Sequence, residues 1–386
     1  MDFNLSDDQK AYQEAARNFA ANELVPHAAE WDQTQHFPVD VVRRAGELGF
    51  CGIYAPEVAG GMALGRMDTH IIFEELAYGC TSTAAYITIH NMCTWMVTTF
   101  GGERLVGEWG PKLTSGAKLA SYCLTEPNAG SDAASLKTSA KKDGDVYILN
   151  GSKCFISGAG STDVLVVMVR TGGPGAGGIS CVLVPANLPG ISYGRKEAKM
   201  GWNSQPTRTI TFDNVVVPVA NRVGEEGEGF KFAMKGLDGG RINIATCSLG
   251  AAQAALDASQ RYMRERHQFG KPIAEFQALQ FKLADMATEL TAARQMVRLA
   301  AFKLDQNDPD ATTYSAMAKR FATDACFRVC NEAIQIHGGY GYIREYPLER
   351  YMRDARVHQI LEGTNEVMRH IIARRVLMEG ATEVIR

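Results

Sequence analysis

Apolar residues recur at three- and four-residue steps through much of residues 1–115, which is the spacing of amphipathic helices. Ser6, followed by two aspartates, is a typical helix N-cap with acidic residues near the positive helix end. Further helical patterns cover 71–78 and 82–100. The stripe after Ser6 consists of Tyr12, Ala15, Ala16, Phe19, Ala20 and Leu24. The pattern predicts an N-terminal α-helical domain.

Between residues 116 and 220, short apolar runs separated by Gly, Asn and Pro replace the helical spacing. No long helical pattern lies between these runs to form parallel crossovers, so we expect an antiparallel β-barrel or sandwich. The predicted strands cover 118–124, 146–150, 153–156, 164–169, 179–184 and 209–212.

Helical spacing returns over residues 221–386, as in a helix of an antiparallel bundle. The clearest stripe there is Leu283, Met286, Leu290, Ala293, Val297 and Ala300. The expected fold class is therefore α+β, with a helical domain over 1–115, a middle β domain over 116–220 and a C-terminal four-helix bundle over 221–386.

Composition is that of a globular protein, with 46% hydrophobic and 22% charged residues among 386. The 40 basic and 43 acidic residues give a net charge of −3, which disfavours nucleic acid or an anionic membrane as the main partner. We find no apolar stretch long enough to span a membrane, and no signal or transit peptide, and therefore expect a cytoplasmic protein. Nine scattered cysteines without a CxxC pair indicate reduced thiols and no metal site.

Two segments could carry cofactor chemistry. The loop over 122–132 offers hydroxyls, small side chains and amides that can approach a planar cofactor closely, although a plain β-turn fixed by Pro127 and Asn128 explains it equally well. Residues 155–157 add an aromatic face and a hydroxyl, or else ordinary core.

Glu362 lies between apolar Leu361 and a helix that Thr364 and Asn365 could cap. Burial raises the pKa of a carboxyl group, which suits a base that removes a weakly acidic carbon-bound proton. The alternative is a solvated glutamate at a helix start.

The segments TEPNAGSD at 125–132 and NGSKCFIS at 150–157 resemble the flavin loop of the acyl-CoA dehydrogenase family. The resemblance covers nearly the whole chain, includes the α-β-α order and continues through RERHQFG at 264–270, QIHGGYG at 335–341 and LEGTNE at 361–366. It implies that the chain binds FAD, forms a homotetramer and passes electrons to electron-transfer flavoprotein.

The same resemblance implies a role for each matching residue. Glu362 corresponds to the base that takes the α-proton of an acyl-CoA thioester while the β-hydride leaves to flavin, and its amide would polarise the thioester carbonyl. The hydroxyls of Thr125 and Ser157 would hydrogen-bond the flavin ring. The diphosphate and adenine of a FAD in a neighbouring subunit would be held by Arg266, Phe276, Gln277 and residues 335–339. The cofactor set is Tyr122, Cys123, Leu124, Thr125, Glu126, Pro127, Asn128, Ala129, Gly130, Ser131, Phe155, Ile156, Ser157, Arg266, Phe276, Gln277, Gln335, Ile336, His337, Gly338, Gly339, Thr364, Asn365 and Glu366. The substrate set is Ser131, Asp238, Gly239, Gly240, Arg241, Gly363 and Arg374.

The substrate follows from finer likenesses. Some relatives carry their base at the position of Gly240, where this chain has no carboxylate, which disfavours an isovaleryl-type site. The segments 201–208, 237–245 and 356–363 resemble the branch that converts isobutyryl-CoA to methacrylyl-CoA in valine breakdown. The alternatives are a 2-methylbutyryl-CoA or straight short-chain dehydrogenase, a flavin-dependent oxidase or monooxygenase, and a non-catalytic acyl-CoA-binding protein.

Overall fold

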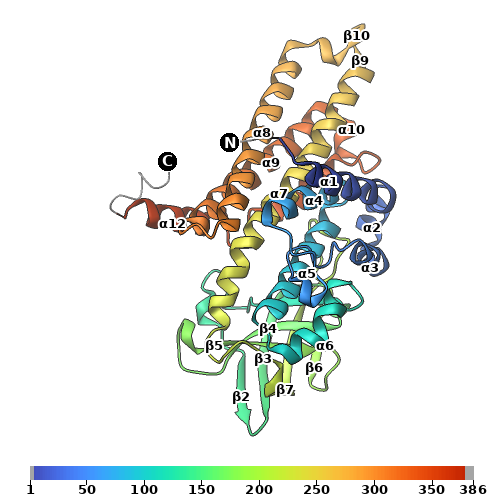
Figure 1. Ribbon diagram of the computed structural model, residues 1–386. Coiled ribbons are helices and arrows are strands. Elements are labelled where there is room, and N and C mark those ends of the chain that lie inside the picture. The colour runs from blue at the N-terminus through green and yellow to red at the C-terminus, as the bar shows by residue number, and fades with distance from the viewer. Residues whose placement is uncertain (1–3, 379–386) are drawn as a thin grey trace.

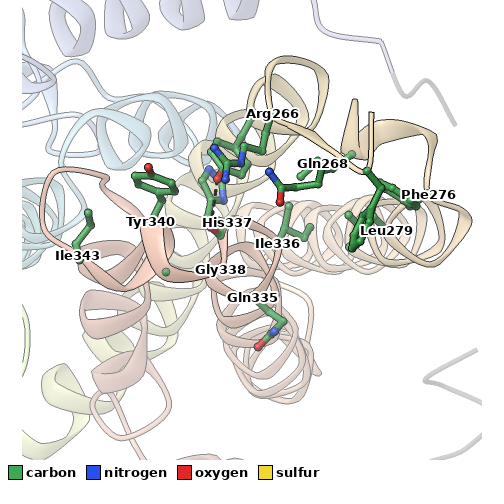
Figure 2. Close-up of a pocket in the computed structure, with 14 residues that line it drawn as sticks. Arg266, Gln268, Phe276, Leu279, Gln335, Ile336, His337, Gly338, Tyr340 and Ile343 are labelled. Atoms are coloured by element: carbon green, nitrogen blue, oxygen red, sulfur yellow. Dashed lines mark hydrogen bonds between the residues drawn. The ribbon is translucent and has the colours of Figure 1, made fainter. Parts of the chain in front are cut away.

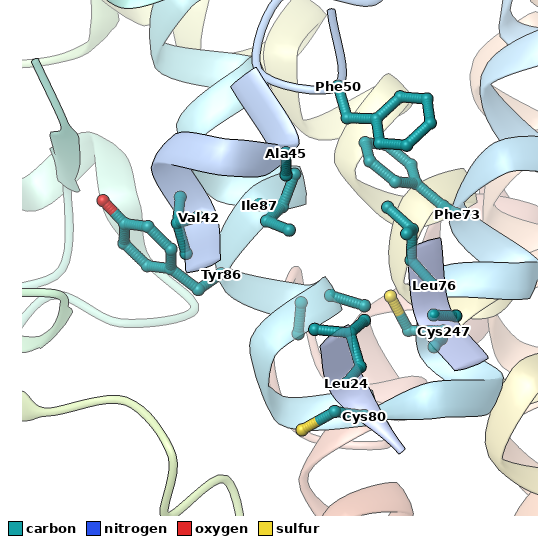
Figure 3. Close-up of a cluster of buried hydrophobic side chains, with 14 of the residues drawn as sticks. Leu24, Val42, Ala45, Phe50, Phe73, Leu76, Cys80, Tyr86, Ile87 and Cys247 are labelled. Carbon is teal, nitrogen blue, oxygen red and sulfur yellow. The ribbon is translucent and has the colours of Figure 1, made fainter. Parts of the chain in front are cut away.

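The structure is a computed structural model that describes residues 4–378. Its N-terminal part is helical, as predicted, and the Ser6 N-cap is confirmed as a capping box with Gln9. Two of its helices, α4 and α5, are buried around most of their circumference, and both contribute residues to the core shown in Figure 3. The helices are α1 (Asp7–Phe19), α2 (Ala28–Thr34), α3 (Val39–Glu47), α4 (Arg66–Gly79), α5 (Thr81–Phe100) and α6 (Glu103–Thr114).

The middle part is one eight-stranded sheet with the order β6-β7-β3-β2-β4-β5-β8, and β1 pairs with β4. The predicted strands are all present, with two of them joined into the bulged strand β3. Three short strands, β2, β6 and β8, were not predicted. The bounds are β1 (Ala120–Cys123), β2 (Ser139–Asp143), β3 (Val146–Ser157), β4 (Val164–Arg170), β5 (Ile179–Pro185), β6 (Ile191–Tyr193), β7 (Thr207–Pro218) and β8 (Arg222–Val223).

The expectation of a purely antiparallel sheet was wrong for two pairings of strand β4. Strand β1 runs parallel to β4, with Ala120 opposite Val164, and β2 meets β4 in a single parallel pair. Parallel neighbours need a long crossover, and the chain provides one without an α-helix. The 124–163 connection contains the candidate cofactor loop and the β2–β3 hairpin.

Strands β4 and β5 are buried on both faces, which fixes the sheet to the helices. Val164 and Val166 pack with residues of α5 and the long helix α7 (Gly229–Glu265). Leu165 and Val167 face the other way, into a core shared with β3 and β7. The sheet thus curls over its own core, as a barrel or sandwich does, and holds the cofactor loop at the helical side.

The C-terminal part is a bundle of long helices with shorter helices across it (Figure 1). The stripe predicted on α8 is confirmed, because Met286, Leu290 and the small residues after them are buried. Helix α7 runs from the sheet to the hairpin of β9 (His267–Gln268) and β10 (Lys271–Pro272) and packs against α4, α5 and α9. The remaining helices are α8 (Gln277–Asp305), α9 (Ala311–His337), α10 (Gly339–Tyr342), α11 (Leu348–His358) and α12 (Asn365–Val376).

Buried hydrogen bonds connect the middle part of the chain to α11, just before the loop that carries Glu362. The Trp202 amide donates to Asp354 at 2.6 Å, and its indole N–H donates to His358 Nε2 at 3.0 Å. The Nδ1 of His358 is then the protonated nitrogen and faces Ser248 Oγ of α7 at 2.7 Å. Burial lowers the pKa of His358 to about 3, so the ring stays neutral and keeps both hydrogen bonds at physiological pH.

No helix within residues 4–378 is both long and apolar enough to cross a membrane. The nine cysteines are all buried free thiols, in agreement with the prediction of reduced cysteines. Across the same residues, we find no cluster of three or more His, Cys, Asp or Glu side chains that could hold a metal ion.

Candidate active site

The loop between α11 and α12 carries Glu362 in an uncommon backbone conformation. Glu362 has a φ of +55° and Gly363 a φ of +87°, so two successive residues lie in the left-handed region. Thr364 then caps α12, as predicted, because its hydroxyl accepts a hydrogen bond from the Val367 amide at 3.2 Å. Strain at a non-glycine residue of this kind is typical of functional sites.

The carboxyl group of Glu362 is buried, although the residue as a whole is partly exposed. Its Oε2 is shielded from solvent and has no hydrogen-bond partner within residues 4–378. Burial raises the pKa of Glu362 to about 7, while the charges of Arg241 and Lys319 act in the opposite direction. The alternative of a solvated surface glutamate is therefore wrong, and the group can exchange a proton near neutral pH.

Glycines on α7 make the space in which this carboxyl group lies. A Cβ atom built on Gly240 would be 2.5 Å from Glu362 Oε2, and one built on Gly236 would be 2.2 Å from the terminal methyl of Met96. Positions 236 and 240 share a helix face, since they are four residues apart. The carboxylate and the methionine side chain of α5 therefore approach the same stretch of α7.

Gly239 accommodates a side chain that the sequence did not single out. The Arg66 guanidinium covers the Gly239 Cα, because a Cβ there would be 2.6 Å from Nη1. The other face of the guanidinium lies over the Tyr54 ring, 3.5 Å from its centroid. Arg66 Nη1 is buried without a hydrogen-bond partner in the described chain. No local signal marks Arg66, which is one of many charged residues at helix starts.

The first strand of the sheet contributes Tyr122 to the surroundings of Glu362. Its hydroxyl is buried without a hydrogen-bond partner in the described chain. Burial raises the pKa of Tyr122 well above its usual value, and the nearby Glu362 carboxylate raises it further. The structure thus brings the beginning of the predicted cofactor loop to the predicted base.

The candidate cofactor loop contains a tight turn, which was the alternative interpretation of this segment. Glu126 and Ala129 exchange two backbone hydrogen bonds, and Pro127 and Asn128 form the exposed corner. The turn leaves Gly130 and Ser131 exposed after it, with no atom within 4 Å of a Cβ built at Gly130. A tight turn and an open approach for a ligand are therefore compatible.

The Glu126 side chain anchors this loop from inside. Its carboxylate accepts from the amides of Lys137 and Thr138 at 2.6 and 2.9 Å and from buried Lys153 Nζ at 2.8 Å. Burial raises the pKa of Glu126, but Lys153 and these hydrogen bonds outweigh it, so the net shift is downward. Lys153 also donates to the Leu124 carbonyl at 3.0 Å. Both side-chain oxygens of Glu126 are used within the protein, so this residue fixes the loop.

The second predicted segment lies directly beside this loop. The Cys154 amide donates to the Thr125 carbonyl at 2.9 Å, and the following bulge gives Phe155 a φ of +57°. The Phe155 side chain is 69% exposed, a high value for an aromatic ring in a sheet. By contrast, Cys123 and Ile156 point into the sheet core and support the loop from below.

Asp238 and Arg241, which are predicted to contact substrate, form an ion pair of 2.6 Å on α7. Thr312 also donates to Asp238 at 2.7 Å, while Arg241 Nε is buried without a hydrogen-bond partner in the described chain. Arg374 and Glu366 are exposed on α12.

A pocket of about 590 Å³ lies at the other end of α7 (Figure 2). Arg266 ends α7 there and places its guanidinium over the Tyr340 ring, 5.5 Å from the centroid. Gln277, which was predicted with this group, is not among the lining residues. The predicted residues that line the pocket are Arg266, Phe276, Gln335, Ile336, His337, Gly338 and Gly339.

This pocket is far from Glu362 within one chain. Gly240, beside the carboxylate, and Arg266, at the pocket, are separated by roughly 39 Å along α7 at about 1.5 Å per residue. The two predicted halves of the cofactor site therefore do not meet in a single copy of the chain.

Three family models match successive parts of the chain, and together they cover most of it. They are described as the acyl-CoA dehydrogenase N-terminal domain (residues 6–117), middle domain (residues 121–215) and C-terminal domain (residues 227–377). The mitochondrial isobutyryl-CoA dehydrogenase of Bos taurus is 58% identical over 97% of this chain and 90% of its own length.

Two solved structures are similar over 98% of this chain and 100% of their own. Butyryl-CoA dehydrogenase from Megasphaera elsdenii has a TM-score of 0.95 and 41% identity. A chain from a structure described as the electron transferring flavoprotein of Acidaminococcus fermentans has a TM-score of 0.96 and 42% identity.

Proposed function

Because the chain belongs to the acyl-CoA dehydrogenase family, we propose that it oxidises isobutyryl-CoA to methacrylyl-CoA, in valine breakdown. The family assignment makes it an FAD-dependent oxidoreductase. The 58% identity with a bovine isobutyryl-CoA dehydrogenase supports the branched substrate. The observation that carries the proposal is the buried, unpartnered Glu362 carboxyl group, which lies against Gly240 and near Tyr122.

Glu362 is the proposed base. Its Oε2 has no internal hydrogen bond to break, so it can accept the α-proton of a thioester placed beside Gly240. Its pKa of about 7 makes the carboxylate basic enough to share that proton at neutral pH, whereas a solvated glutamate would be a much weaker base. The Glu362 amide is the proposed donor to the thioester carbonyl, which would make the α-proton more acidic.

The residues present fit a flavin. The open approach at Gly130 and the exposed ring of Phe155 offer space and an aromatic surface at this loop. When bound, FAD supplies the acceptor for the β-hydride. Thr125, Ser131 and Ser157 are the proposed polar contacts in this region, and Glu126 holds the loop in place through its carboxylate.

We propose a homotetramer in which one copy completes the cofactor site of another. The roughly 39 Å between Gly240 and Arg266 along α7 supports this, because the lining of the second pocket is too far from the loop of its own chain. The Arg266 guanidinium is suited to a diphosphate. Electron-transfer flavoprotein is the proposed electron acceptor, and a chain similar to this one occurs in a structure described as such a flavoprotein. We also propose a cytoplasmic location for this chain, in contrast to the bovine relative, which is described as mitochondrial.

Anaerobic bleaching of the flavin tests the activity. The purified holoenzyme is mixed separately with isobutyryl-CoA, 2-methylbutyryl-CoA, butyryl-CoA and isovaleryl-CoA. We expect isobutyryl-CoA to bleach the flavin fastest. Faster bleaching by another thioester would keep the reaction and change the substrate, while bleaching by none would contradict a dehydrogenase. Peroxide or a hydroxylated product formed without another electron acceptor would indicate an oxidase or monooxygenase.

A further inference from the structure

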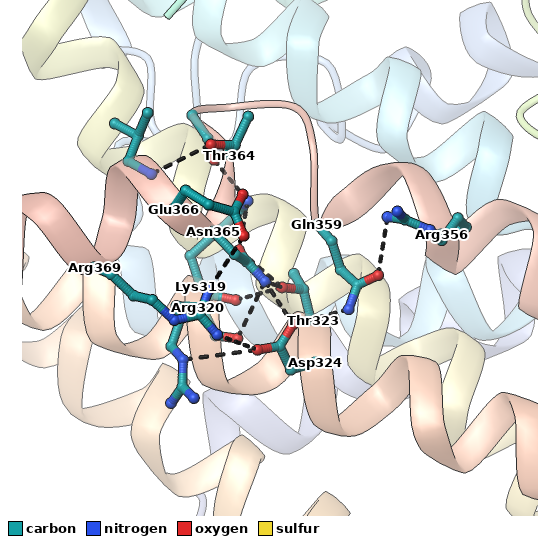
Figure 4. Close-up of polar contacts among 12 residues, drawn as sticks. Lys319, Arg320, Thr323, Asp324, Arg356, Gln359, Thr364, Asn365, Glu366 and Arg369 are labelled. Atoms are coloured by element: carbon teal, nitrogen blue, oxygen red, sulfur yellow. Dashed lines mark hydrogen bonds and ion pairs between the residues drawn. The ribbon is translucent and has the colours of Figure 1, made fainter.

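The loop that carries Glu362 is fastened to one face of α9 by a buried lysine (Figure 4). The Lys319 side chain is fully buried, and its Nζ donates to the Gly363 carbonyl at 2.7 Å and to Asn365 Oδ1 at 2.9 Å. The residue immediately after the proposed base is thus held by a hydrogen bond from a lysine of another helix.

The flanks of the loop are bound to the same face of α9. Asn365 donates to Thr323 Oγ1 at 2.9 Å and to Asp324 Oδ1 at 2.7 Å. On the other side of the loop, Gln359 donates to the same Asp324 oxygen at 2.8 Å. These bonds fix both ends, and Lys319 is the group that reaches the left-handed turn between them.

The amine of Lys319 also faces the carboxylate. Burial lowers the pKa of Lys319 to about 7, while the nearby Glu362 carboxylate acts in the opposite direction and favours the protonated amine. Arg241 on α7 and Lys319 on α9 are the cations that act on Glu362, while Tyr122 from β1 and Cys93 from α5 approach it as weak acids. Arg241 is already paired with an aspartate at 2.6 Å. Lys319 forms no salt bridge with any of the residues 4–378, and both of its hydrogen-bond acceptors are neutral groups.

We propose that Lys319 is a positioning residue for the dehydrogenation: it holds the Gly363 carbonyl, thereby aims the Glu362 carboxylate at the space beside Gly240, and stabilises that carboxylate when it is ionised. The inference rests on the proposed function. Without the amine, the Gly363 carbonyl would lose its buried partner, and the strained turn would relax. The proposal therefore predicts two separable effects, one on geometry and one on charge.

Two substitutions separate these effects. Lys319→Met removes both the donor and the charge, whereas Lys319→Arg keeps the charge on a larger group. The matched control is Lys282→Met, which removes a lysine paired with Glu332 at the α8–α9 surface. The readouts are flavin absorbance of the purified holoenzyme, the bleaching rate at saturating isobutyryl-CoA as a function of pH, and the thioester concentration that gives half the maximal rate.

We expect Lys319→Met to retain flavin and to bleach about a hundredfold more slowly, as for a base displaced by about 1 Å. Its acid limb should move to higher pH, because the positive charge that the protonated lysine places near Glu362 is lost. Lys319→Arg should be slow with an acid limb in the wild-type position, and Lys282→Met should match the wild type. The half-saturating concentration should change little in all of them.

A Lys319→Met holoenzyme with the wild-type rate and acid limb would overturn the inference and leave the proposed function intact. If that variant does not fold, Lys319→Arg decides, since a wild-type rate in it would overturn the geometric role. A wild-type protein that none of the four thioesters bleaches would overturn the proposed function, and the inference with it.

Discussion

Replacing Gly240 with alanine should separate stability from catalysis. The added methyl would lie 2.5 Å from Glu362 Oε2 and 3.0 Å from its carboxyl carbon. Ordinary contact begins at 3.4 Å, so the carboxylate must retreat by about 0.9 Å. Because the displaced atoms are the far end of a flexible side chain, the cost in folding free energy is small. Alanine also favours a helix interior over glycine by about 1 kcal/mol, so α7 itself should gain.

The retreat moves the atoms that are proposed to accept the proton. A displacement near 1 Å at a reacting group can cost up to about a hundredfold in rate. We therefore expect Gly240→Ala to slow flavin bleaching by roughly ten- to a hundredfold, about 1.4–2.7 kcal/mol in the activation free energy. Its thermal midpoint should stay constant or rise.

The assay is anaerobic stopped-flow bleaching by isobutyryl-CoA, with thermal unfolding followed by circular dichroism. Gly107→Ala is the matched control, because Gly107 lies in α6 with no atom within 4 Å of the added methyl. The control should stabilise the helix and leave the rate unchanged. A Gly240→Ala enzyme that is as stable as the wild type and bleaches at the wild-type rate would refute the placement of the carboxylate.

Three further outcomes are expected. Glu362→Gln should keep its flavin and lose turnover by about a thousandfold or more, because an amide cannot accept the proton; near-normal turnover would contradict the base. With the pKa of Glu362 at about 7, kcat/KM should fall as the pH drops through that value, since protonation removes the base. A flat profile down to about pH 5 would contradict this role of Glu362. Lys153→Met should lower the free energy of unfolding, measured in urea, by about 3–5 kcal/mol, because it leaves the Glu126 carboxylate buried without its cation. The same change should weaken flavin binding. An unchanged urea transition would show that the pair is dispensable.

The hydrophobic pattern predicted those helices and strands whose own sequence shows which residues are buried. The stripe on α8 repeats at the helical period, and β4 is a short continuous apolar run, as expected for a strand buried on both faces. Strands β2, β6 and β8 were missed because they are short and carry exposed or polar residues. The parallel β1–β4 pair was also missed, since pairing direction depends on the route of the chain, which spacing does not record.

The candidate site divides in the same way. Apolar neighbours and a helix cap made Glu362 a candidate, but the resemblance to the family was needed to prefer it over a solvated glutamate. The tight turn of the cofactor loop followed from its Pro and Asn, which are local cues. Lys319 and Arg66 were missed, since each is an ordinary charged residue in its own helix. Their significance comes from contacts with the Glu362 loop and with Gly239, which only the tertiary structure brings about.

Glycines at 236, 239 and 240 connect these parts, because each allows a different element to approach α7. A Cβ would meet Met96 of α5 at the first position, Arg66 of α4 at the second and Glu362 at the third. The proton acceptor and the walls near it are thus set by contacts with about one turn of a single helix. That turn lies within α7, which packs against α4, α5 and α9, so it cannot shift without disturbing several helices at once. Helix packing therefore fixes the position at which the Glu362 carboxylate must lie for the proposed proton transfer. The loop that carries Glu362 sets the direction from which the carboxylate approaches α7.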